Sequence, residues 1–355
     1  MTKRLVIFGL SISSSWGNGH AIPFRGLCRE LAARGWQITF FERDVEWYRS
    51  NRDVTNPDYC DLRFYDDVSA TTECLSSAAA VLVGSYVPQG ADVIDAALRS
   101  GRPVLFYDID TPVTLTALRR AGATEYLRAD QIPRFETYFS FTGGPALQEL
   151  KAVWGARAAE PLYCAVDPQL YQPVAPQEKF QCLLGYMGTY APDRQPRLER
   201  FLIDTARRRP ADRFLIAGAQ YPRMDLPPNV GHEIHLYPRD HAAFYCSNFA
   251  TLNLTRDAMR QYGWSPASRL FEAAACGACI VSDSWRGLDE LLQPETEVLL
   301  ADTRSDVEMH LSSLTPQRRA SIGAAARERV LREHTFSQRA DQLEAGLLRA
   351  LGARI

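Results

Sequence analysis

Short apolar segments that suit β-strands alternate with segments of helical periodicity along most of this chain. In the first half, strands are expected at residues 5–10, 37–42, 79–86, 103–110 and 137–143. Helices are expected between several of them, at residues 23–35, 91–100 and 112–121. Strands that are apolar throughout and separated by helices are typical of a parallel sheet covered on both faces. The sequence therefore predicts the α/β class.

The alternating pattern breaks once and then begins again. Residues 163–180 contain three prolines and no periodicity, which is typical of an interdomain linker. Beyond them, strands are expected at residues 181–188, 214–219, 232–237, 249–254 and 279–284, and the last helices at 316–333 and 336–351. The chain has 355 residues, which is long for one α/β domain.

Two domains follow from this repetition. We expect an N-terminal Rossmann-like domain at 1–165, a linker at 166–180 and a C-terminal Rossmann-like domain at 181–335. The helix at 336–355 is expected to pack back on the N-terminal domain. Open parallel sheets bind ligands at the carboxyl ends of their strands, so two doubly wound sheets are expected to face a central cleft.

The charge balance and the cysteines exclude several classes of function. Lys and Arg total 40 against 42 Asp and Glu, so no general nucleic-acid partner is expected. Eight cysteines are scattered without metal-ligand spacing and are expected to be small buried apolar residues, with Cys276 and Cys279 in a tight turn rather than a dithiol. No bound metal and no cofactor is predicted.

No segment of the sequence suits a membrane or an export signal. The apolar run at residues 5–10 is short and a Gly-rich loop follows it, which favours a first strand over a signal peptide. No stretch is long enough to cross a bilayer. We therefore expect a cytoplasmic protein without a transmembrane segment.

Residues 265–292 carry the strongest functional signal. Ser265 and Pro266 predict the start of a helix that ends at Gly277. The amino end of a helix suits a diphosphate, because its backbone N–H groups and its dipole favour an anion. Glu272 would lie one to two turns into this helix, where a carboxylate could accept both hydroxyls of a ribose. The alternative is an ordinary solvated helix carboxylate.

The segment LFEAAACGACIVSD resembles the glutamate-containing motif of GT-B glycosyltransferases. In that family the glutamate, here Glu272, binds the ribose of the sugar donor. More narrowly, the segments GLSISSSWGNGHA, FYDIDTPVTL, LNLTRDAM and GWSPASRLFEAAACGACIVSDSW together resemble the spore maturation protein CgeB-like glycosyltransferases. The resemblance implies a GT-B fold and the transfer of a hexose from a nucleoside diphosphate-sugar, with a UDP-sugar favoured, to a hydroxyl of a glycan, a small molecule or a protein.

One position departs from the family pattern. Retaining GT-B enzymes of family 4 place a second glutamate eight residues before the first to hold the donated sugar, and here Trp264 occupies that position. The sequence therefore leaves open whether the reaction inverts or retains the anomeric configuration.

Further residues are expected around the diphosphate. Gly188 and Thr189 would let backbone N–H groups and a hydroxyl approach a phosphate, and Arg194 would neutralise it. Arg256 follows an apolar strand and would stabilise the departing nucleoside diphosphate as a metal does elsewhere. A surface ion pair is the alternative for both arginines. The expected donor-binding set is Gly188, Thr189, Arg194, Tyr237, Asn253, Thr255, Arg256, Trp264, Ser265, Ser268, Arg269 and Glu272.

Acceptor and catalytic residues are expected after the first-domain strands. The segment from Gly19 to Phe41 resembles the start of family 1 glycosyltransferases, in which a histidine matching His20 deprotonates the acceptor. Asp110 follows another strand, and capping of the next helix is the alternative to a catalytic role. The catalytic candidates are His20, Asp110 and Arg256, and the acceptor-binding candidates are Ser14, Ser15, Trp16, Asn18 and Gly19.

Three other functions are compatible with this architecture. A sugar-nucleotide epimerase would use the same scaffold but needs several carboxylates around the sugar, which Trp264 disfavours. A non-catalytic sugar-nucleotide-binding subunit of a glycosylation complex is the second alternative. An NAD-dependent dehydrogenase is disfavoured because the glycine fingerprint of dinucleotide sites is absent.

Overall fold

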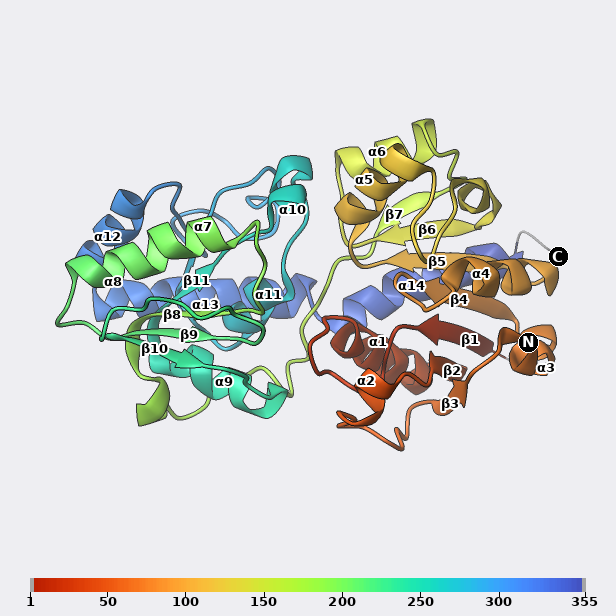
Figure 1. Ribbon diagram of the computed structural model, residues 1–355, viewed down its shortest axis with the longest axis horizontal. Helices are drawn as coiled ribbons and strands as arrows, with labels where there is room; N and C mark the ends of the chain where they lie inside the picture. The colour runs from red at the N-terminus through yellow and green to blue at the C-terminus, as the bar shows by residue number, and fades with distance from the viewer. Residues whose placement is uncertain (1–2, 353–355) are drawn as a thin grey trace. The chain divides into compact units, whose positions relative to one another are not determined.

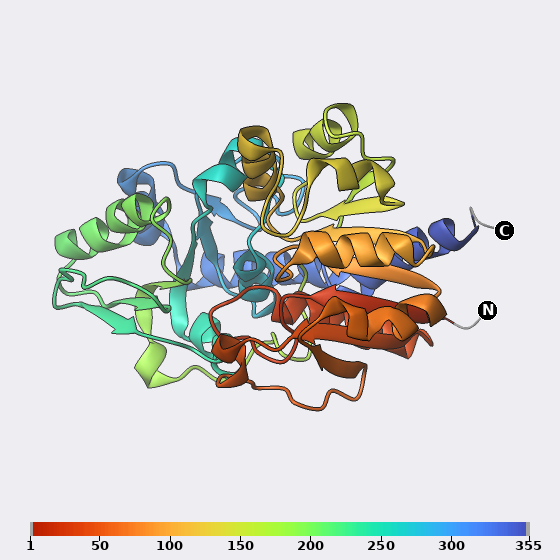
Figure 2. The same cartoon turned by 45° about the vertical axis from the view of Figure 1, so that its right-hand side comes forward.

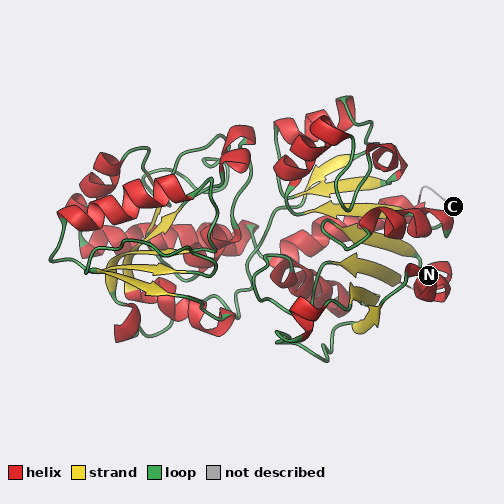
Figure 3. Cartoon of the chain, viewed as in Figure 1, coloured by secondary structure: helices red, strands yellow, loops and turns green. Residues whose placement is uncertain are grey.

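The computed structural model of the protein describes residues 3–352, and it divides into two compact units. The first unit holds the chain up to Cys164 together with the segment from Phe336 onward, and the second is Ala165–Thr335. Both units alternate strands with helices along the chain (Figure 3). Each unit contains its own parallel sheet.

The sheet of the first unit has seven strands in the order β3-β2-β1-β4-β5-β6-β7, all parallel. The strands are β1 (Arg4–Gly9), β2 (Gln37–Arg43), β3 (Asp61–Tyr65), β4 (Ala80–Gly84), β5 (Val104–Asp108), β6 (Thr137–Ser140) and β7 (Ala159–Pro161). The helices are α1 (Ala21–Ala33), α2 (Glu46–Arg49), α3 (Thr72–Ser77), α4 (Gly90–Arg99), α5 (Thr111–Ala121), α6 (Pro145–Ala152) and α14 (Phe336–Gly352). Figure 2 shows α4 in front of this sheet.

The C-terminal helix α14 is part of the first unit and packs on α1 and β4. Gly26 permits this packing, because a Cβ there would lie 2.3 Å from the ring of Phe336. Glu344 on α14 accepts hydrogen bonds from Lys3 Nζ and Trp36 Nε1, both at 2.8 Å. These contacts hold the end of the chain to the sheet with which the chain begins.

The sheet of the second unit has six parallel strands in the order β10-β9-β8-β11-β12-β13. They are β8 (Cys182–Met187), β9 (Phe214–Ala217), β10 (Val230–Glu233), β11 (Asn248–Asn253), β12 (Ile280–Ser282) and β13 (Leu299–Leu300). The helices are α7 (Gln195–Leu198), α8 (Asp204–Arg208), α9 (Pro238–Ser247), α10 (Asp257–Tyr262), α11 (Ser268–Ala275), α12 (Arg304–Ser313) and α13 (Pro316–Glu333). Figure 1 shows α7 and α8 on one side of this sheet and α9 on the other.

The predicted fold class of two doubly wound parallel sheets is confirmed. In both orders the chain starts in the middle of the sheet, moves to one edge and then returns to build the other side. Each sheet therefore has a point where neighbouring crossovers diverge, and such points are where open α/β sheets bind ligands. In the first unit this point lies at the carboxyl ends of β1 and β4, and in the second at those of β8 and β11.

Three boundaries differ from the sequence predictions. The strand expected at 232–237 is β10, Val230–Glu233, so Tyr237 does not end a strand; it precedes Pro238 as the N-cap of α9 and is exposed. The helix expected from Ser265 begins at Ser268, because Ala267, the N-cap, still has extended dihedral angles. Residues 166–180, expected to be a linker, belong to the second unit, where Val166 pairs with Thr335 and Tyr171 is buried.

Within residues 3–352, no helix combines the length and apolar character needed to span a bilayer.

Candidate functional site

The loop after β8 belongs to the candidate nucleotide site in the second unit. The N–H of Gly188 donates to the carbonyl of Ala217 at 2.8 Å, and the carbonyl of Gly188 accepts from the Tyr221 hydroxyl at 3.0 Å. A Cβ at Gly188 would lie 2.7 Å from the Tyr186 hydroxyl and 2.9 Å from Nη2 of Arg269. The backbone N–H of Gly188 itself is used within the sheet, so the predicted approach of backbone N–H groups to a phosphate would have to involve other residues of this loop. Glycine instead leaves room for Arg269.

Two arginines converge over one tyrosine beside this glycine. The guanidinium of Arg194 lies 5.8 Å and that of Arg269 5.4 Å from the ring centroid of Tyr186. Arg194 donates to the carbonyl of Thr189, and Arg269 donates to the carbonyl of Leu254 at 2.9 Å. Neither guanidinium forms an ion pair with a carboxylate of the described residues, whereas most other arginines near this site do.

The electrostatics of the two arginines favour an anion. Arg194 is buried, and burial together with the positive charge of Arg269 holds the pKa of Arg194 below its ordinary value. Buried charges are normally paired, because desolvation without a partner costs several kcal/mol. The surface ion pair that was the alternative for Arg194 is absent. Arg269 differs, because despite burial nearby tyrosines and the charge of Glu272 raise its pKa. Among the described residues, two guanidiniums without an ion pair thus lie close together, and this pair is the candidate anion site.

The second of these arginines lies at the amino end of a helix. Arg269 is the second residue of α11, so its guanidinium adds to the positive end of the helix dipole. Ser268 is the first residue of α11, and Ser265 is buried in the segment before it. The candidate anion site therefore combines a helix terminus with two side-chain cations.

Glu272 follows one turn after the start of α11 and is buried. The Tyr245 hydroxyl of α9 donates a hydrogen bond to its Oε2 at 3.3 Å. Burial and the hydrogen bond to Glu272 raise the pKa of the Tyr171 hydroxyl, which also lies 3.1 Å from Nδ1 of His241. The solvated helix carboxylate that was the alternative for Glu272 is thus excluded. Two tyrosines orient this carboxylate one helical turn from Arg269.

Asn253 and Thr255, expected to contact the sugar donor, are instead bound within their own unit. Nδ2 of Asn253 donates to Oγ of Ser282 at 2.9 Å, which ties β11 to β12. The backbone N–H of Thr255 donates to both oxygens of Asp283 at 3.1 Å, and its hydroxyl donates to Oδ1 at 3.0 Å. These bonds fix both side chains within the unit, while Oδ1 of Asn253 is buried and has no hydrogen-bond partner among the described residues. Their predicted contact with the donor stays a prediction.

Arg256 is held differently from Arg194 and Arg269. Its Nε lies 3.6 Å from Oδ2 of Asp193, and its side chain is 40% exposed. The same Asp193 oxygen accepts the N–H of Asp257, the first residue of α10. Arg256 therefore has the ion pair that was its alternative interpretation, and its charge is partly neutralised before any ligand arrives.

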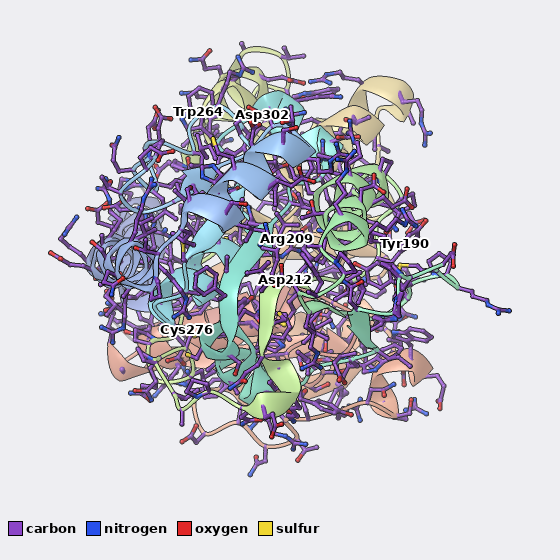
Figure 4. All side chains as sticks on the ribbon, turned by 90° about the vertical axis from the view of Figure 1, so that its left-hand side faces the viewer. Tyr190, Arg209, Asp212, Trp264, Cys276 and Asp302 are labelled. Atoms are coloured by element: carbon purple, nitrogen blue, oxygen red, sulfur yellow. The ribbon has the colours of Figure 1, made fainter. Side chains whose placement is uncertain are left out.

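Trp264 and Tyr237 complete the predicted set in the second unit. Trp264 has a positive φ of 44°, its N–H donates to the carbonyl of Arg286 at 2.6 Å, and the Arg286 guanidinium lies 5.7 Å from its ring centroid. A Cβ at Gly287 would lie 2.4 Å from the Trp264 ring, so the indole packs on that glycine. Trp264 and Cys276, at the two ends of the segment around α11, are labelled in Figure 4. Tyr237 is exposed, and its ring packs edge-on against that of His235 at 4.6 Å.

The loop after β1 in the first unit is held by a buried carboxylate. Glu42 on β2 accepts from the backbone N–H groups of Ile12 and Ser13 at 2.7 and 2.9 Å, and from the hydroxyls of Ser11 and Ser13. Glu42 is completely buried, so this ordered loop keeps its shape without a ligand.

Most predicted acceptor residues serve this loop. The hydroxyl of Ser14 donates to the carbonyl of Asn51 at 2.8 Å, and the hydroxyl of Ser15 donates to Asp53 at 2.8 Å. Oδ1 of Asn18 accepts the N–H groups of His20 and Ala21 at 3.0 and 3.2 Å, so Asn18 caps the start of α1. Two candidates are differently placed: Trp16 stacks edge-on against Trp47 at 4.7 Å, and a Cβ at Gly19 would meet nothing within 4 Å.

His20 is buried beside an aromatic pair. Its ring lies 5.2 Å from that of Tyr86, which in turn lies 4.7 Å from that of Tyr126. Its Nδ1 has no hydrogen-bond partner among the described residues, and burial lowers the pKa of His20 to about 4. The imidazole is therefore neutral at pH 7 and able to accept a proton. Its side chain makes no hydrogen bond that caps α1.

Asp108 and Asp110 differ in their surroundings at the end of β5. Oδ2 of Asp108 accepts from the Tyr138 hydroxyl at 2.6 Å and Oδ1 from the Thr114 hydroxyl at 3.0 Å, and burial raises the pKa of Asp108 to about 6. Asp110 occupies the N-cap position of α5, but its side chain makes no capping hydrogen bond. The helix is held instead by the Asp110 carbonyl, which accepts from Thr114.

Sequence reasoning missed several residues of this arrangement. Tyr245 and Tyr171 orient Glu272 but lie in a helix and in the proline-rich segment, without a motif. Buried Arg197 pairs with Asp257 at 2.7 Å and with Asp283 at 3.6 Å, which fixes the end of β11. Within residues 3–352, no group of three or more His, Cys, Asp or Glu side chains is arranged to hold a metal ion.

Comparison with known proteins agrees with this geometry. Residues 194–345 match a family described as glycosyl transferase-like. Sucrose-phosphate synthase from Thermosynechococcus elongatus aligns over 99% of this chain and 100% of its own, at 15% identity and a TM-score of 0.67. The fold is GT-B.

Two further solved structures share the GT-B fold. Anabaena HepE, solved in complex with UDP and glucose, aligns over 98% of this chain and 100% of its own at 13% identity and a TM-score of 0.70. An alpha-glucosyltransferase, solved with UDP and DNA, aligns over 98% and 100% at 11% identity and a TM-score of 0.70. No curated protein sequence matches the chain. At these identities the solved structures establish the fold alone, and the matched family covers the part of the chain that contains Arg194, Arg269 and Glu272.

Proposed function

We propose that the protein is a glycosyltransferase that moves a hexose from a nucleoside diphosphate-sugar to a hydroxyl group. A UDP-sugar is the favoured donor, since HepE and the alpha-glucosyltransferase of the same fold were both solved with UDP. The acceptor hydroxyl belongs to a glycan, a small molecule or a protein, and the narrower affiliation that we propose is the CgeB-like group. No metal takes part in the proposed reaction.

The observation that carries the proposal is the arginine pair over Tyr186. Arg194 and Arg269 present two guanidiniums that no carboxylate neutralises, at the amino end of α11. A diphosphate carries charge on two neighbouring groups and matches this pair better than a single carboxylate does. Charge on the leaving nucleoside diphosphate grows as the sugar departs, so fixed cations stabilise the transition state more than the ground state.

Glu272 is proposed to bind the ribose next to the diphosphate. Its carboxylate lies one turn beyond Arg269 on the same helix and is already oriented by Tyr245 and Tyr171. A carboxylate has free lone pairs after these bonds and accepts from two vicinal hydroxyls. Pre-orientation reduces the entropy lost on binding. We propose a supporting role for Arg256, because Asp193 already engages its guanidinium.

His20 is the proposed base for the acceptor hydroxyl. Because burial keeps the imidazole neutral at pH 7, its Nδ1 lone pair is available to take a proton. A pKa of about 4 makes it a weak base in the free protein. Direct attack with His20 as base would invert the anomeric configuration.

The test is binding and turnover measured on one preparation. Calorimetry should detect UDP binding without added metal and in the presence of a chelator, and the variant Arg269→Met should abolish it. UDP-sugars incubated with acceptor panels should release UDP and yield a glycosylated product. An isomerised sugar nucleotide formed without an acceptor would identify an epimerase instead. Tight UDP binding without turnover on any acceptor would favour a non-catalytic subunit, and no UDP binding would refute the proposal.

A further inference from the structure

Two cysteines from distant parts of the second unit meet beside Glu272. Cys246 is in the last turn of α9, and Cys276 is the C-cap residue of α11. The Cys246 thiol donates a hydrogen bond to the backbone carbonyl of Cys276 at 3.6 Å, and the two thiol side chains interact with each other. The backbone N–H of Val174 donates to the same sulfur at 3.4 Å. The sequence drew attention to Cys276 and Cys279, but the spatial partner of Cys276 is Cys246.

The two thiols have unequal surroundings. Cys246 is partly exposed to solvent, whereas Cys276 is buried. The hydrogen bond from Cys276 lowers the pKa of Cys246 to about 6, with help from the Val174 N–H and the charge of Arg319. A lowered pKa increases the fraction of Cys246 that is thiolate, which is the form that reacts with oxidants. The same hydrogen bond raises the pKa of Cys276, which stays a thiol.

A second cysteine pair in the chain provides a contrast. Cys28 and Cys60 also interact, but Cys28 is completely buried, and burial followed by its bond to Cys60 raises the pKa of Cys28. Proximity of two cysteines is therefore not enough to distinguish the pair Cys246 and Cys276 from the pair Cys28 and Cys60. The combination of an accessible thiolate and a buried partner thiol occurs at Cys246 and Cys276.

We propose that Cys246 and Cys276 are a site of oxidation by peroxides, at which they form a disulfide bond. The Cys246 thiolate attacks one oxygen of hydrogen peroxide, the O–O bond breaks, hydroxide leaves, and Cys246 becomes a sulfenic acid. The Cys276 sulfur then attacks the Cys246 sulfur, the S–O bond breaks, and the thiol proton leaves with the oxygen as water. Two thiols are oxidised to one disulfide while the peroxide is reduced. A thiol reductant reverses the reaction.

The position of this pair connects it to the proposed nucleotide site. Cys246 directly follows Tyr245, whose hydroxyl bonds Glu272, and the N–H of Cys276 donates to the Glu272 carbonyl at 3.2 Å. A disulfide would draw the end of α9 toward the end of α11 and shift Tyr245 against Glu272. Oxidation is therefore expected to weaken UDP binding. This consequence depends on the proposed function, whereas the disulfide itself does not.

The chemical test uses the full-length reduced protein and hydrogen peroxide. After quenching and alkylation, peptide mapping by mass spectrometry should find the Cys246–Cys276 disulfide before any product of Cys28 and Cys60. The variant Cys276→Ser should stop at a sulfenic acid on Cys246 that dimedone captures, and Cys246→Ser should give neither product. The proposal is overturned if Cys246 stays reduced while other cysteines are oxidised, or if Cys276→Ser yields no dimedone adduct on Cys246.

The functional arm compares UDP affinity in the two redox states by calorimetry. The oxidised wild-type protein should bind UDP at least about threefold more weakly than the reduced protein, and a reductant should restore affinity. Reduced Cys246→Ser should bind UDP like the wild type and show no response to peroxide, which also verifies that it is folded. If reduced wild type binds UDP and disulfide formation leaves its affinity unchanged, the link to the site is refuted. If UDP does not bind at all, the proposed function fails, and peptide mapping still decides the disulfide.

Discussion

The Tyr245 hydroxyl donates a hydrogen bond to Oε2 of Glu272 at 3.3 Å, which joins helix α9 to helix α11. Glu272 is buried, and Tyr171 hydrogen-bonds it from the segment that opens the second unit. A carboxylate held by two hydroxyls has fixed lone-pair directions before any ligand arrives. The two tasks proposed for α11 therefore fall on different residues: the anion on Arg269 near its amino end, and the ribose hydroxyl groups on Glu272 one turn later.

Replacing Glu272 by Gln should separate these two tasks. We expect UDP affinity to fall about tenfold, because an amide loses the charge that strengthens bonds from ribose hydroxyls. Affinity for inorganic pyrophosphate should stay within about twofold of wild type, since that anion has no ribose. Calorimetry with both ligands checks this. Equal losses for UDP and pyrophosphate would place Glu272 in the anion site instead.

Replacing Arg269 by Met should abolish ligand binding with little effect on folding. UDP and pyrophosphate affinities should both fall about 30-fold or more, because a guanidinium that contacts the diphosphate is lost. The free energy of unfolding should change by no more than about 1 kcal/mol, since the lost bond to Leu254 is offset by reduced repulsion of Arg194.

Arg197→Met is the matched control for Arg269→Met. Unlike Arg269, Arg197 pairs with carboxylates: it is buried and forms ion pairs with Asp257 and Asp283. Breaking buried ion pairs leaves uncompensated carboxylates, so this variant should lose about 3–5 kcal/mol of unfolding free energy. Urea unfolding of both variants provides the comparison. A comparable destabilisation by Arg269→Met would mean that Arg269 serves the fold rather than a ligand.

The strands were predictable wherever they are buried on both faces. β1, β4 and β5 are continuous apolar runs, and their positions follow directly from hydrophobicity. β3 escaped prediction because it is an edge strand with exposed charged residues such as Asp61 and Arg63, and β7 because it has only three residues. Edge strands lack the apolar signal that sequence reasoning depends on.

The candidate site was predictable as far as its local motif extends. Glu272 and Arg269 lie within one helix, and the resemblance covers that helix. The contacts of Glu272 with Tyr245 and Tyr171 join residues that are 27 and about 100 positions apart, and no local pattern encodes them. The sequence also could not reveal three other pairs, because their members lie on different strands and loops. They are Asn253 with Ser282, Thr255 with Asp283, and Arg256 with Asp193.

Gly188→Ala should displace the side chain of Arg269 by a steric clash. The new Cβ would lie 2.7 Å from the Tyr186 hydroxyl and 2.9 Å from Nη2 of Arg269, so the guanidinium must move. We expect UDP affinity to drop about tenfold and the unfolding free energy to fall by about 1–3 kcal/mol, as in other overpacked sites. Gly19→Ala is the control, since a Cβ there meets nothing within 4 Å. Unchanged UDP binding by Gly188→Ala would show that the position of Gly188 does not affect the UDP site.

Asp108→Asn should stabilise the protein at neutral pH. Burial raises the pKa of Asp108 to about 6, so the folded state binds this proton more tightly than the unfolded state, whose carboxyl has a pKa of 3.8. The stability that this group contributes is complete below pH 3.8 and is lost as the pH rises through 6. An amide has no charge to desolvate, so at pH 7 the variant should gain up to about 3 kcal/mol. Urea unfolding at pH 7 and pH 4 should show this gain only at pH 7, and an equal effect at both would contradict it.

The pH dependence contributed by His20 should have the opposite sign. Burial lowers the pKa of His20 to about 4 from 6.5, so between these values the unfolded state binds more protons than the folded state. Stability should therefore fall as the pH decreases from 6.5 towards 4, by up to about 3 kcal/mol in all. Because Asp108 acts in the reverse direction between pH 4 and 6, the two contributions partly cancel in the wild type. In Asp108→Asn the loss of stability on acidification should become steeper, and in Asp108→Asn combined with His20→Gln it should flatten. Urea midpoints measured at several pH values between 4 and 7 test this, and identical slopes in the single and double variants would show that His20 titrates normally in the folded protein.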